Sequence, residues 1–229
     1  MPRSSSATRA EIEKYRDDVS RNKVRCELPH CPVCESSPDL FTRHQARSRK
    51  FYILCEKLVQ TVLCLVIRWR CPGCGKSFTQ QPPFAFPRKR YTRESILDLS
   101  ACYVEDEAAT YRATVLDDEG MPIFHALSAE GDVPGYRGLA HSTPYRWITT
   151  VSGFKQILRA AQDLILQENP ASPVCRELAA IEISGRKYVK AAREAVLKRC
   201  RQVLQLEARF RATFFTSIFP LFATRCAWG

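Results

Sequence analysis

Several features common in enzymes and membrane proteins are missing from this chain of 229 residues. It has no Gly-rich phosphate-binding loop and no convincing Ser/His/Asp set. The apolar stretch from Leu58 to Ile67 is too short to span a bilayer, and the first residues contain no run resembling a signal peptide. We therefore expect a cytoplasmic, nucleoid-associated protein with no membrane association, no small-molecule substrate and no catalytic residues of its own.

The composition is that of a folded protein with an excess of basic residues. Apolar residues make up 45% of the chain and charged residues 26%, which argues against wholesale disorder. The net charge is +11, and it is unevenly distributed. Residues 1–100 carry 19 Lys and Arg against 10 Asp and Glu, whereas residues 101–150 carry 3 against 8. Such a basic excess favours an acidic partner, of which nucleic acid is the commonest.

Four of the eleven cysteines form two C-x-x-C pairs, Cys31-Pro-Val-Cys34 and Cys71-Pro-Gly-Cys74. Paired cysteines in a reducing compartment indicate metal ligands rather than disulfides. Each turn directs two thiolates at one point, and two such turns complete a tetrahedral set with no open position. The spacing therefore predicts one structural Zn²⁺ held by these four residues.

Other interpretations of the cysteines remain open from the sequence. Cys26 and His30 lie just before the first pair, and either could replace Cys31 as a ligand. The four thiols could also be buried free cysteines or a redox pair, although no βαβ pattern surrounds either C-x-x-C. The remaining cysteines fall singly, mostly among apolar residues, as core cysteines do.

The pattern along the chain predicts an α+β protein, in which a small β zinc ribbon precedes a mostly helical region. Apolar β-branched runs indicate strands at Phe51–Leu54 and Val62–Trp69. Thr92 is a suitable N-cap for a helix, and a second helix is expected over residues 106–116. The expected segments are a mobile basic arm (1–25), the zinc ribbon (26–80), a proline-rich basic linker (81–91), a region with helix-turn-helix-like units (92–153) and a helical C-terminal region (154–229).

Basic side chains cluster in the hairpin, around the second cysteine pair and on the linker. Spaced this way, guanidinium and ammonium groups can follow a phosphate backbone, so we predict that they contact double-stranded DNA. They are Arg43, Arg47, Arg49, Lys50, Arg68, Arg70, Lys76, Arg88, Lys89, Arg90 and Arg93.

The segment Ser142–Val151 has the character of a recognition helix. Thr143 suits an N-cap and Pro144 suits the first helical position. In helix-turn-helix proteins the first residues of the second helix meet base edges in the major groove. The predicted contacts are Ser142, Thr143, Tyr145 and Arg146. The alternative is an ordinary amphipathic helix with a buried Trp147.

The order of motifs resembles the N-terminal DNA-binding region of bacterial insertion-sequence transposases and the stand-alone transposase-like zinc-ribbon proteins. The similarity covers about residues 26–155 and is most specific in RWRCPGCGKSFT, followed by PPFAFPRKRYT and HSTPYRWI. It implies a zinc ribbon ahead of helix-turn-helix units that hold a transposon end. Two departures stand out. The gap between Arg112 and His141 is long and acidic, and only 75 residues follow Phe154, without the carboxylate-bearing catalytic core of such transposases.

We therefore expect a zinc-dependent DNA-binding protein that acts as a transposition accessory or regulator. One alternative is a zinc-stabilised interaction adaptor that forms a homodimer through its C-terminal helices. The amphipathic helix expected after Gly185, with Arg193 among its polar residues, would form the dimer contact. The other alternative is a fragment of a DDE-type transposase whose catalytic core lies elsewhere.

Overall fold

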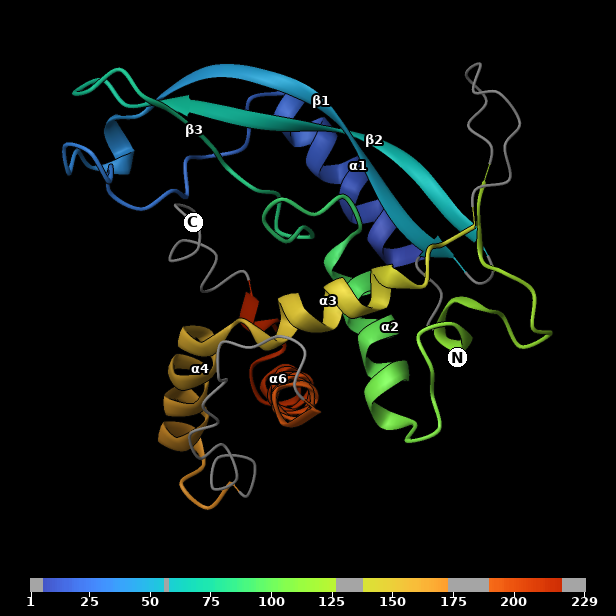
Figure 1. The fold of residues 1–229 in the computed structure, drawn as a ribbon. Helices are drawn as coiled ribbons and strands as arrows, with labels where there is room; N and C mark the ends of the chain where they lie inside the picture. Colours follow the sequence, from blue (N-terminus) through green and yellow to red (C-terminus); the bar gives the residue numbers. More distant parts are fainter. Residues whose placement is uncertain (1–5, 56–57, 127–137, 173–189, 220–229) are drawn as a thin grey trace. The chain divides into compact units, whose positions relative to one another are not determined.

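The computed structural model describes residues 6–55, 58–126, 138–172 and 190–219 (Figure 1). It is mixed α+β, as the sequence predicts, with an antiparallel hairpin at its N-terminal end and mostly helices after it. The chain divides into two compact units. The described part of the first comprises residues 6–95 (except 56–57) and 124–126, and that of the second comprises residues 96–123, 138–172 and 190–219.

A long β-hairpin is the framework of the first unit. Strand β1 (Thr42–Cys55) pairs antiparallel with β2 (Leu58–Arg70), with a bulge between Arg43 and Gln45. The other edge of β2 carries two short strands, antiparallel β3 (Ser77–Thr79) and parallel β4 (Phe124–His125). Both predicted strands are confirmed, because Phe51–Leu54 lies within β1 and Val62–Trp69 within β2.

Helix α1 (Ser6–Ser20) packs on one face of this hairpin, as Figure 1 shows. Ile12, Tyr15 and Val19 lie three and four residues apart, so they form one buried stripe on the helix. The Cys64 thiol of β2 approaches the Ile12 carbonyl at 3.7 Å. The expectation of a mobile arm is thus wrong for these residues. Three apolar side chains at helical spacing are enough to hold the helix in place when they pack against a sheet.

The proline-rich segment 81–91 is also part of the first unit's core. It contains no helix or longer strand, as expected of a linker, but Phe84 and Phe86 are almost fully buried. The Phe84 ring meets the rings of Tyr15 and Phe51 edge-on at 5.8 and 5.2 Å. Its description as an extended linker is therefore wrong, because its aromatic residues hold the chain against the hairpin.

Helix α2 (Arg93–Glu105) begins in the first unit and continues in the second. The Thr92 hydroxyl accepts a hydrogen bond from the Ser95 amide at 3.5 Å, which confirms Thr92 as its cap. No helix forms over 106–116 apart from a 3₁₀ turn, η2 (Ala113–Val115). The Asp106 carboxylate accepts from the Ala108 amide and so offers the backbone a turn in place of a helix.

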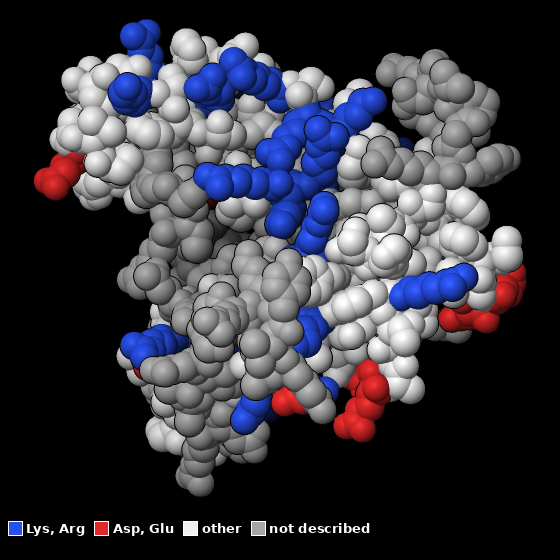
Figure 2. Space-filling model, in the orientation of Figure 1, with Lys and Arg blue, Asp and Glu red and all other residues white. Residues whose placement is uncertain are grey.

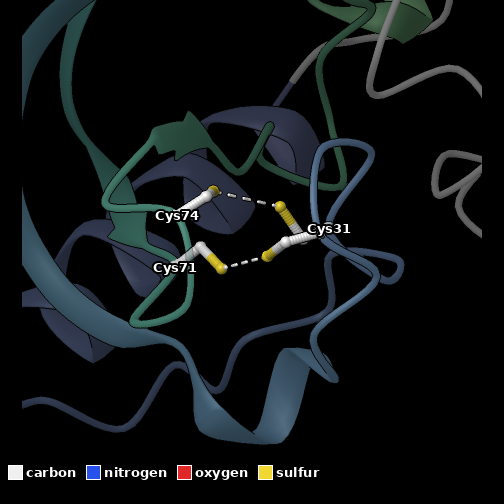
Figure 3. Close-up of side chains that lie close together, drawn as sticks. Cys31, Cys71 and Cys74 are labelled. Carbon is white, nitrogen blue, oxygen red and sulfur yellow. Dashed lines mark hydrogen bonds between the residues drawn. The ribbon is translucent and has the colours of Figure 1, made fainter.

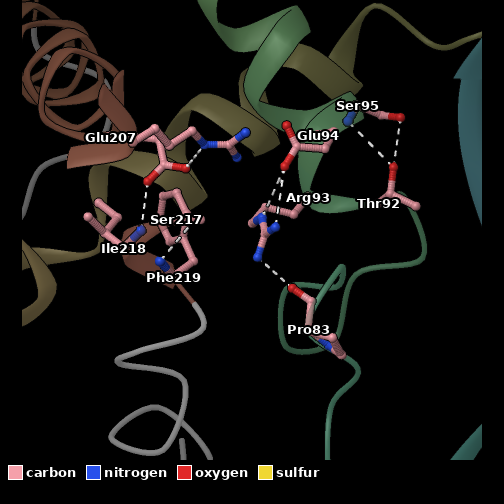
Figure 4. A network of polar contacts seen from close by, with 10 residues as sticks. Pro83, Thr92, Arg93, Glu94, Ser95, Glu207, Ser217, Ile218 and Phe219 are labelled. Carbon is pink, nitrogen blue, oxygen red and sulfur yellow. Dashed lines mark hydrogen bonds and ion pairs between the residues drawn. The ribbon is translucent and has the colours of Figure 1, made fainter. Parts of the chain in front are cut away.

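Within the described residues, the second unit contains three further helices: α3 (Ser142–Ser152), α4 (Lys155–Glu168) and α6 (Lys190–Phe214). Helices α3 and α4 both contact α6. Trp147 and Ile148 of α3 and Leu206 of α6 are buried. The buried Glu207 carboxylate of α6 accepts hydrogen bonds from the Arg211 side chain and from the Ile218 amide beyond the helix, which fixes the turn after α6 (Figure 4).

Candidate metal centre

Two loops at the base of the hairpin bring the four predicted cysteine ligands together. Cys31 and Cys34 lie in the loop before the 3₁₀ turn η1 (Pro38–Leu40) and β1, whereas Cys71 and Cys74 lie in the turn between β2 and β3. Their four Sγ atoms all lie within 4.8 Å of one another (Figure 3). The antiparallel pairing of β1 with β2 produces this meeting, since it places Thr42 opposite Arg70.

The sulfur–sulfur distances fit one tetrahedral ion. The Sγ atoms of Cys31 and Cys74 are 3.5 Å apart, and those of Cys34 and Cys71 are 3.4 Å apart. Four thiolates at bonds of about 2.3 Å in a tetrahedron lie about 3.8 Å from one another. The cluster is therefore consistent with a structural metal site.

The two cysteine turns share one backbone pattern. In the first, the Cys31 amide donates to the Ser36 carbonyl at 3.0 Å and the Glu35 amide to the Cys31 carbonyl at 2.8 Å. In the second, the Cys71 amide donates to the Lys76 carbonyl and the Gly75 amide to the Cys71 carbonyl, both at 2.9 Å. The first turn lacks the glycine of the second, yet it closes with the same bonds.

Gly73 and Ser36 shape the space between the turns. A Cβ on Gly73 would lie 2.7 Å from the Ser36 hydroxyl and 3.1 Å from the Cys34 sulfur, so this position has no room for a side chain. The Ser36 hydroxyl lies 3.1 Å from the Cys34 sulfur and can donate to it. The sequence analysis did not predict a role for Ser36. Its position two residues after the second cysteine is the signal that could have indicated a contact with the cysteine sulfurs.

Hydrogen bonds to sulfur favour the thiolate form of two of the cysteines. The Ser36 hydroxyl and amide lower the pKa of Cys34. Burial acts to raise the pKa of Cys71, but hydrogen bonds from the Cys74 amide and from Ser36 outweigh it and lower that pKa to about 6. The Lys76 amide lowers the pKa of Cys74, yet burial and the neighbouring thiols raise it to about 12. Metal ligation requires thiolates, so Cys34 and Cys71 are the cysteines of this cluster that lose their protons most readily for it.

Neither competitor for Cys31 belongs to the cluster. Cys31 is buried with its sulfur against Cys74, whereas His30 is exposed. Cys26 packs against the hydrophobic core of the first unit instead, where burial raises its pKa. Among the described residues, the four cysteines are the only His, Cys, Asp and Glu group that could hold a metal ion.

Most of the predicted DNA contacts on the hairpin and the segment after it reach the surface. Figure 2 shows Lys and Arg side chains gathered on this face, in the region where Figure 1 draws the hairpin. Arg49 is half-buried with its guanidinium 5.3 Å from the centre of the Phe51 ring, and it donates to the Lys89 carbonyl at 3.1 Å. The exposed members are Arg47, Lys50, Arg70, Lys76, Arg88 and Arg90, and the half-buried ones are Arg43, Arg49, Arg68 and Lys89.

Arg93 does not belong to this surface. It is buried, its guanidinium donates to the Pro83 carbonyl, and it pairs with Glu94 at 3.3 Å (Figure 4). These contacts hold the proline-rich segment against the start of α2. The prediction that Arg93 contacts DNA is therefore wrong, because its guanidinium is used in contacts inside the first unit.

The predicted recognition helix forms, but it begins earlier than expected. Helix α3 starts at Ser142, so Thr143 and Pro144 are its second and third residues and not its N-cap and first residue. Ser142 and Arg146 are exposed and Thr143 is half-buried, whereas Tyr145 packs edge-on against Tyr111 at 5.8 Å. Trp147 is buried, as the alternative of an ordinary amphipathic helix also requires.

Comparisons of the chain with family models, with curated proteins and with solved structures found no match. The resemblance to transposase DNA-binding regions therefore rests on the sequence motifs alone. Across the described residues, no helix combines the length and the apolar character needed to cross a membrane.

Proposed function

We propose that this protein binds one structural Zn²⁺ through Cys31, Cys34, Cys71 and Cys74. Four sulfur ligands at tetrahedral spacing select Zn²⁺ or iron, and zinc is the usual ion of two C-x-x-C turns at the base of a hairpin. With four protein ligands the ion has no open position for substrate, so its role is to hold the two turns together. Native mass spectrometry should find one zinc per chain, and a coloured, iron-containing protein would contradict this assignment.

We further propose that the first unit binds double-stranded DNA through its phosphate backbone. The observation that supports this most directly is the crowding of like charges beside β1. Burial lowers the pKa of Arg49, and the nearby charge of Arg90 lowers it further. Among the ion pairs of the described residues, none involves Arg47, Arg49 or Arg90. Like charges held together without carboxylates favour a bound polyanion, and phosphate is the anion that arginine recognises best.

The salt dependence of DNA affinity distinguishes this proposal from weak non-specific binding of DNA by a few surface lysines. If about six basic groups contact phosphates, affinity for random-sequence duplex should fall on the order of a thousandfold between roughly 50 and 200 mM salt. Chelating the zinc should reduce binding, because the ion fixes the base of the hairpin that carries these side chains. An absence of binding at low salt in an electrophoretic mobility shift assay would refute the proposal.

The transposase-like motifs suggest one biological setting for this activity. In that setting the protein would act as an accessory or regulator that holds the ends of a mobile element. Preferential binding to element-end DNA over random duplex at equal salt supports that role, and equal affinity for both contradicts it.

A further inference from the structure

A half-buried arginine in the second unit is surrounded by three tyrosines. The Arg193 guanidinium of α6 lies 5.0 Å from the ring centre of Tyr111, 5.1 Å from that of Tyr145 and 5.9 Å from that of Tyr103. The Tyr103 and Tyr111 rings stack at 4.5 Å, and Tyr145 meets Tyr111 edge-on. Residues from α2, α3, α6 and the turn after α2 thus form one cage around a single positive charge.

Three hydrogen-bond donors in this cage have no acceptor among the residues that the structure describes. Both terminal nitrogens of Arg193 are buried without a hydrogen-bond partner, and so is the Tyr111 hydroxyl. Burial lowers the pKa of Arg193, and none of the ion pairs among the described residues involves it. Cation–π contacts offset part of the cost of burying a guanidinium, but they satisfy none of its N–H groups.

The geometry points to a binding site for a phosphate group at Arg193. Two terminal guanidinium nitrogens and a tyrosine hydroxyl supply more donors than the two oxygens of a carboxylate need, and arginine binds phosphate bidentately. All four residues are only half-buried, so the cage lies near the surface of the unit, but the donor atoms themselves are covered, and an entering oxyanion must displace the side chains that cover them. This site lies in the second unit and does not depend on the proposed role of the hairpin.

Titration of the full, zinc-loaded chain with inorganic phosphate tests this assignment. At constant ionic strength, phosphate should raise the melting temperature of the wild type and broaden its ³¹P resonance, whereas acetate should do neither. Arg193→Met should weaken phosphate binding at least tenfold. Arg209→Met is the matched control, because Arg209 lies exposed on the same helix, and this variant should bind like the wild type. Equal responses of the two variants, or no response of the wild type, would overturn the assignment.

Two further measurements keep the test decisive. Should Arg193→Met fail to fold, Tyr111→Phe keeps the ring and removes one hydroxyl, and it should weaken phosphate binding while the fold persists. A mononucleotide and a short duplex, compared with inorganic phosphate, show which source supplies the group. If duplex binding by the wild type and by Arg193→Met is equal while phosphate binding differs, the site takes a free phosphate or a nucleotide. Because duplex binding is measured separately with hairpin variants, failure of the phosphate site and failure of the DNA proposal remain distinguishable.

Discussion

Glu35 and Gly75 occupy the same position in the two cysteine turns, each four residues after the first cysteine of its pair. Both have positive φ, at 59° for Glu35 and 70° for Gly75. The backbone of the first turn therefore adopts a left-handed residue without the glycine that usually provides it. The two turns close with equivalent hydrogen bonds, so this conformation belongs to the turn whichever residue type occupies the position.

This equivalence predicts opposite effects of two substitutions. Glu35→Gly should stabilise the zinc-loaded protein by up to about 1 kcal/mol, because it relieves the left-handed strain of a residue with a Cβ. Gly75→Ala should destabilise it by about 1 kcal/mol, since a Cβ there meets only Arg70 at 3.7 Å and the cost is conformational. Urea unfolding measures both, with Glu35→Ala as the control that should change little. A destabilised Glu35→Gly variant would contradict the argument.

Ligand choice can be tested by comparing two neighbouring cysteines. Cys31→Ser should lose zinc, because its sulfur lies in the cluster, whereas Cys26→Ser should keep one zinc per chain. Zinc content by mass spectrometry is the measurement, and Cys102→Ser, at an exposed position on α2, is a second control. Retention of zinc by Cys31→Ser would mean that Cys26 or His30 can supply the fourth ligand.

The Ser36 hydroxyl should extend zinc binding to lower pH. It lowers the pKa of Cys34, so the thiolate persists to a lower pH and competes better for zinc against protons. Ser36→Ala should therefore move the midpoint of acid-induced zinc release to a higher pH, measured with a chromogenic zinc indicator. Ser37→Ala removes a neighbouring hydroxyl that contacts Asp39 instead, and it should leave the midpoint unchanged. If Ser36→Ala released zinc at the same pH midpoint as Ser37→Ala, the Ser36 hydroxyl would have no role in the pH dependence of zinc binding.

The charges beside β1 should each contribute to the salt dependence of DNA binding. Arg49→Gln and Arg90→Gln should each weaken duplex binding, and each should reduce the slope of log affinity against log salt by about 1. Arg209→Gln, an exposed substitution in the second unit, is the control and should leave the slope unchanged. Fluorescence anisotropy across a salt series gives these values, and wild-type slopes in both hairpin variants would remove the two arginines from the interface.

Helix α1 should be essential to the first unit. Ile12→Ala removes a side chain with no exposed surface and should cost about 2–5 kcal/mol of unfolding free energy. Glu11→Ala, on the exposed side of the same helix, should have little effect. Chemical denaturation compares the two variants. Equal stabilities would mean that α1 is only loosely attached.

The grouping of the four cysteines and the strands were predictable because local sequence specifies them. The C-x-x-C turns and the apolar run Val62–Trp69 each form from neighbouring residues, so their patterns survive in the folded chain. Phe84 and Ile12 were missed because their burial depends on partners distant in sequence. From sequence alone the proline-rich segment has the pattern of a linker, because the contact of Phe84 with Phe51 is not visible there. The sequence of α1 is likewise mostly polar, and only the fold shows that the sheet covers its three apolar residues.

Side-chain roles were harder to predict than positions. Arg93 and Tyr145 carry the chemistry of DNA contacts, and they lie where the sequence expects a DNA surface. Only their three-dimensional neighbours, the Pro83 carbonyl and the Tyr111 ring, show that each takes part in internal packing. The helix predicted over 106–116 failed for a similar reason, because the carboxylate of Asp106 can bond to the backbone of a turn as well as begin a helix.

The meeting of two cysteine pairs at the base of the hairpin links metal retention to strand pairing. In an unfolded chain each pair is a separate two-sulfur chelator, and neither holds an ion as firmly as four sulfurs do. The two pairs come together as one four-sulfur centre only when β1 pairs with β2. The affinity of the proposed zinc site is consequently coupled to the pairing of β1 with β2. A substitution at the far end of the strands, remote from every ligand, would therefore speed the loss of the ion.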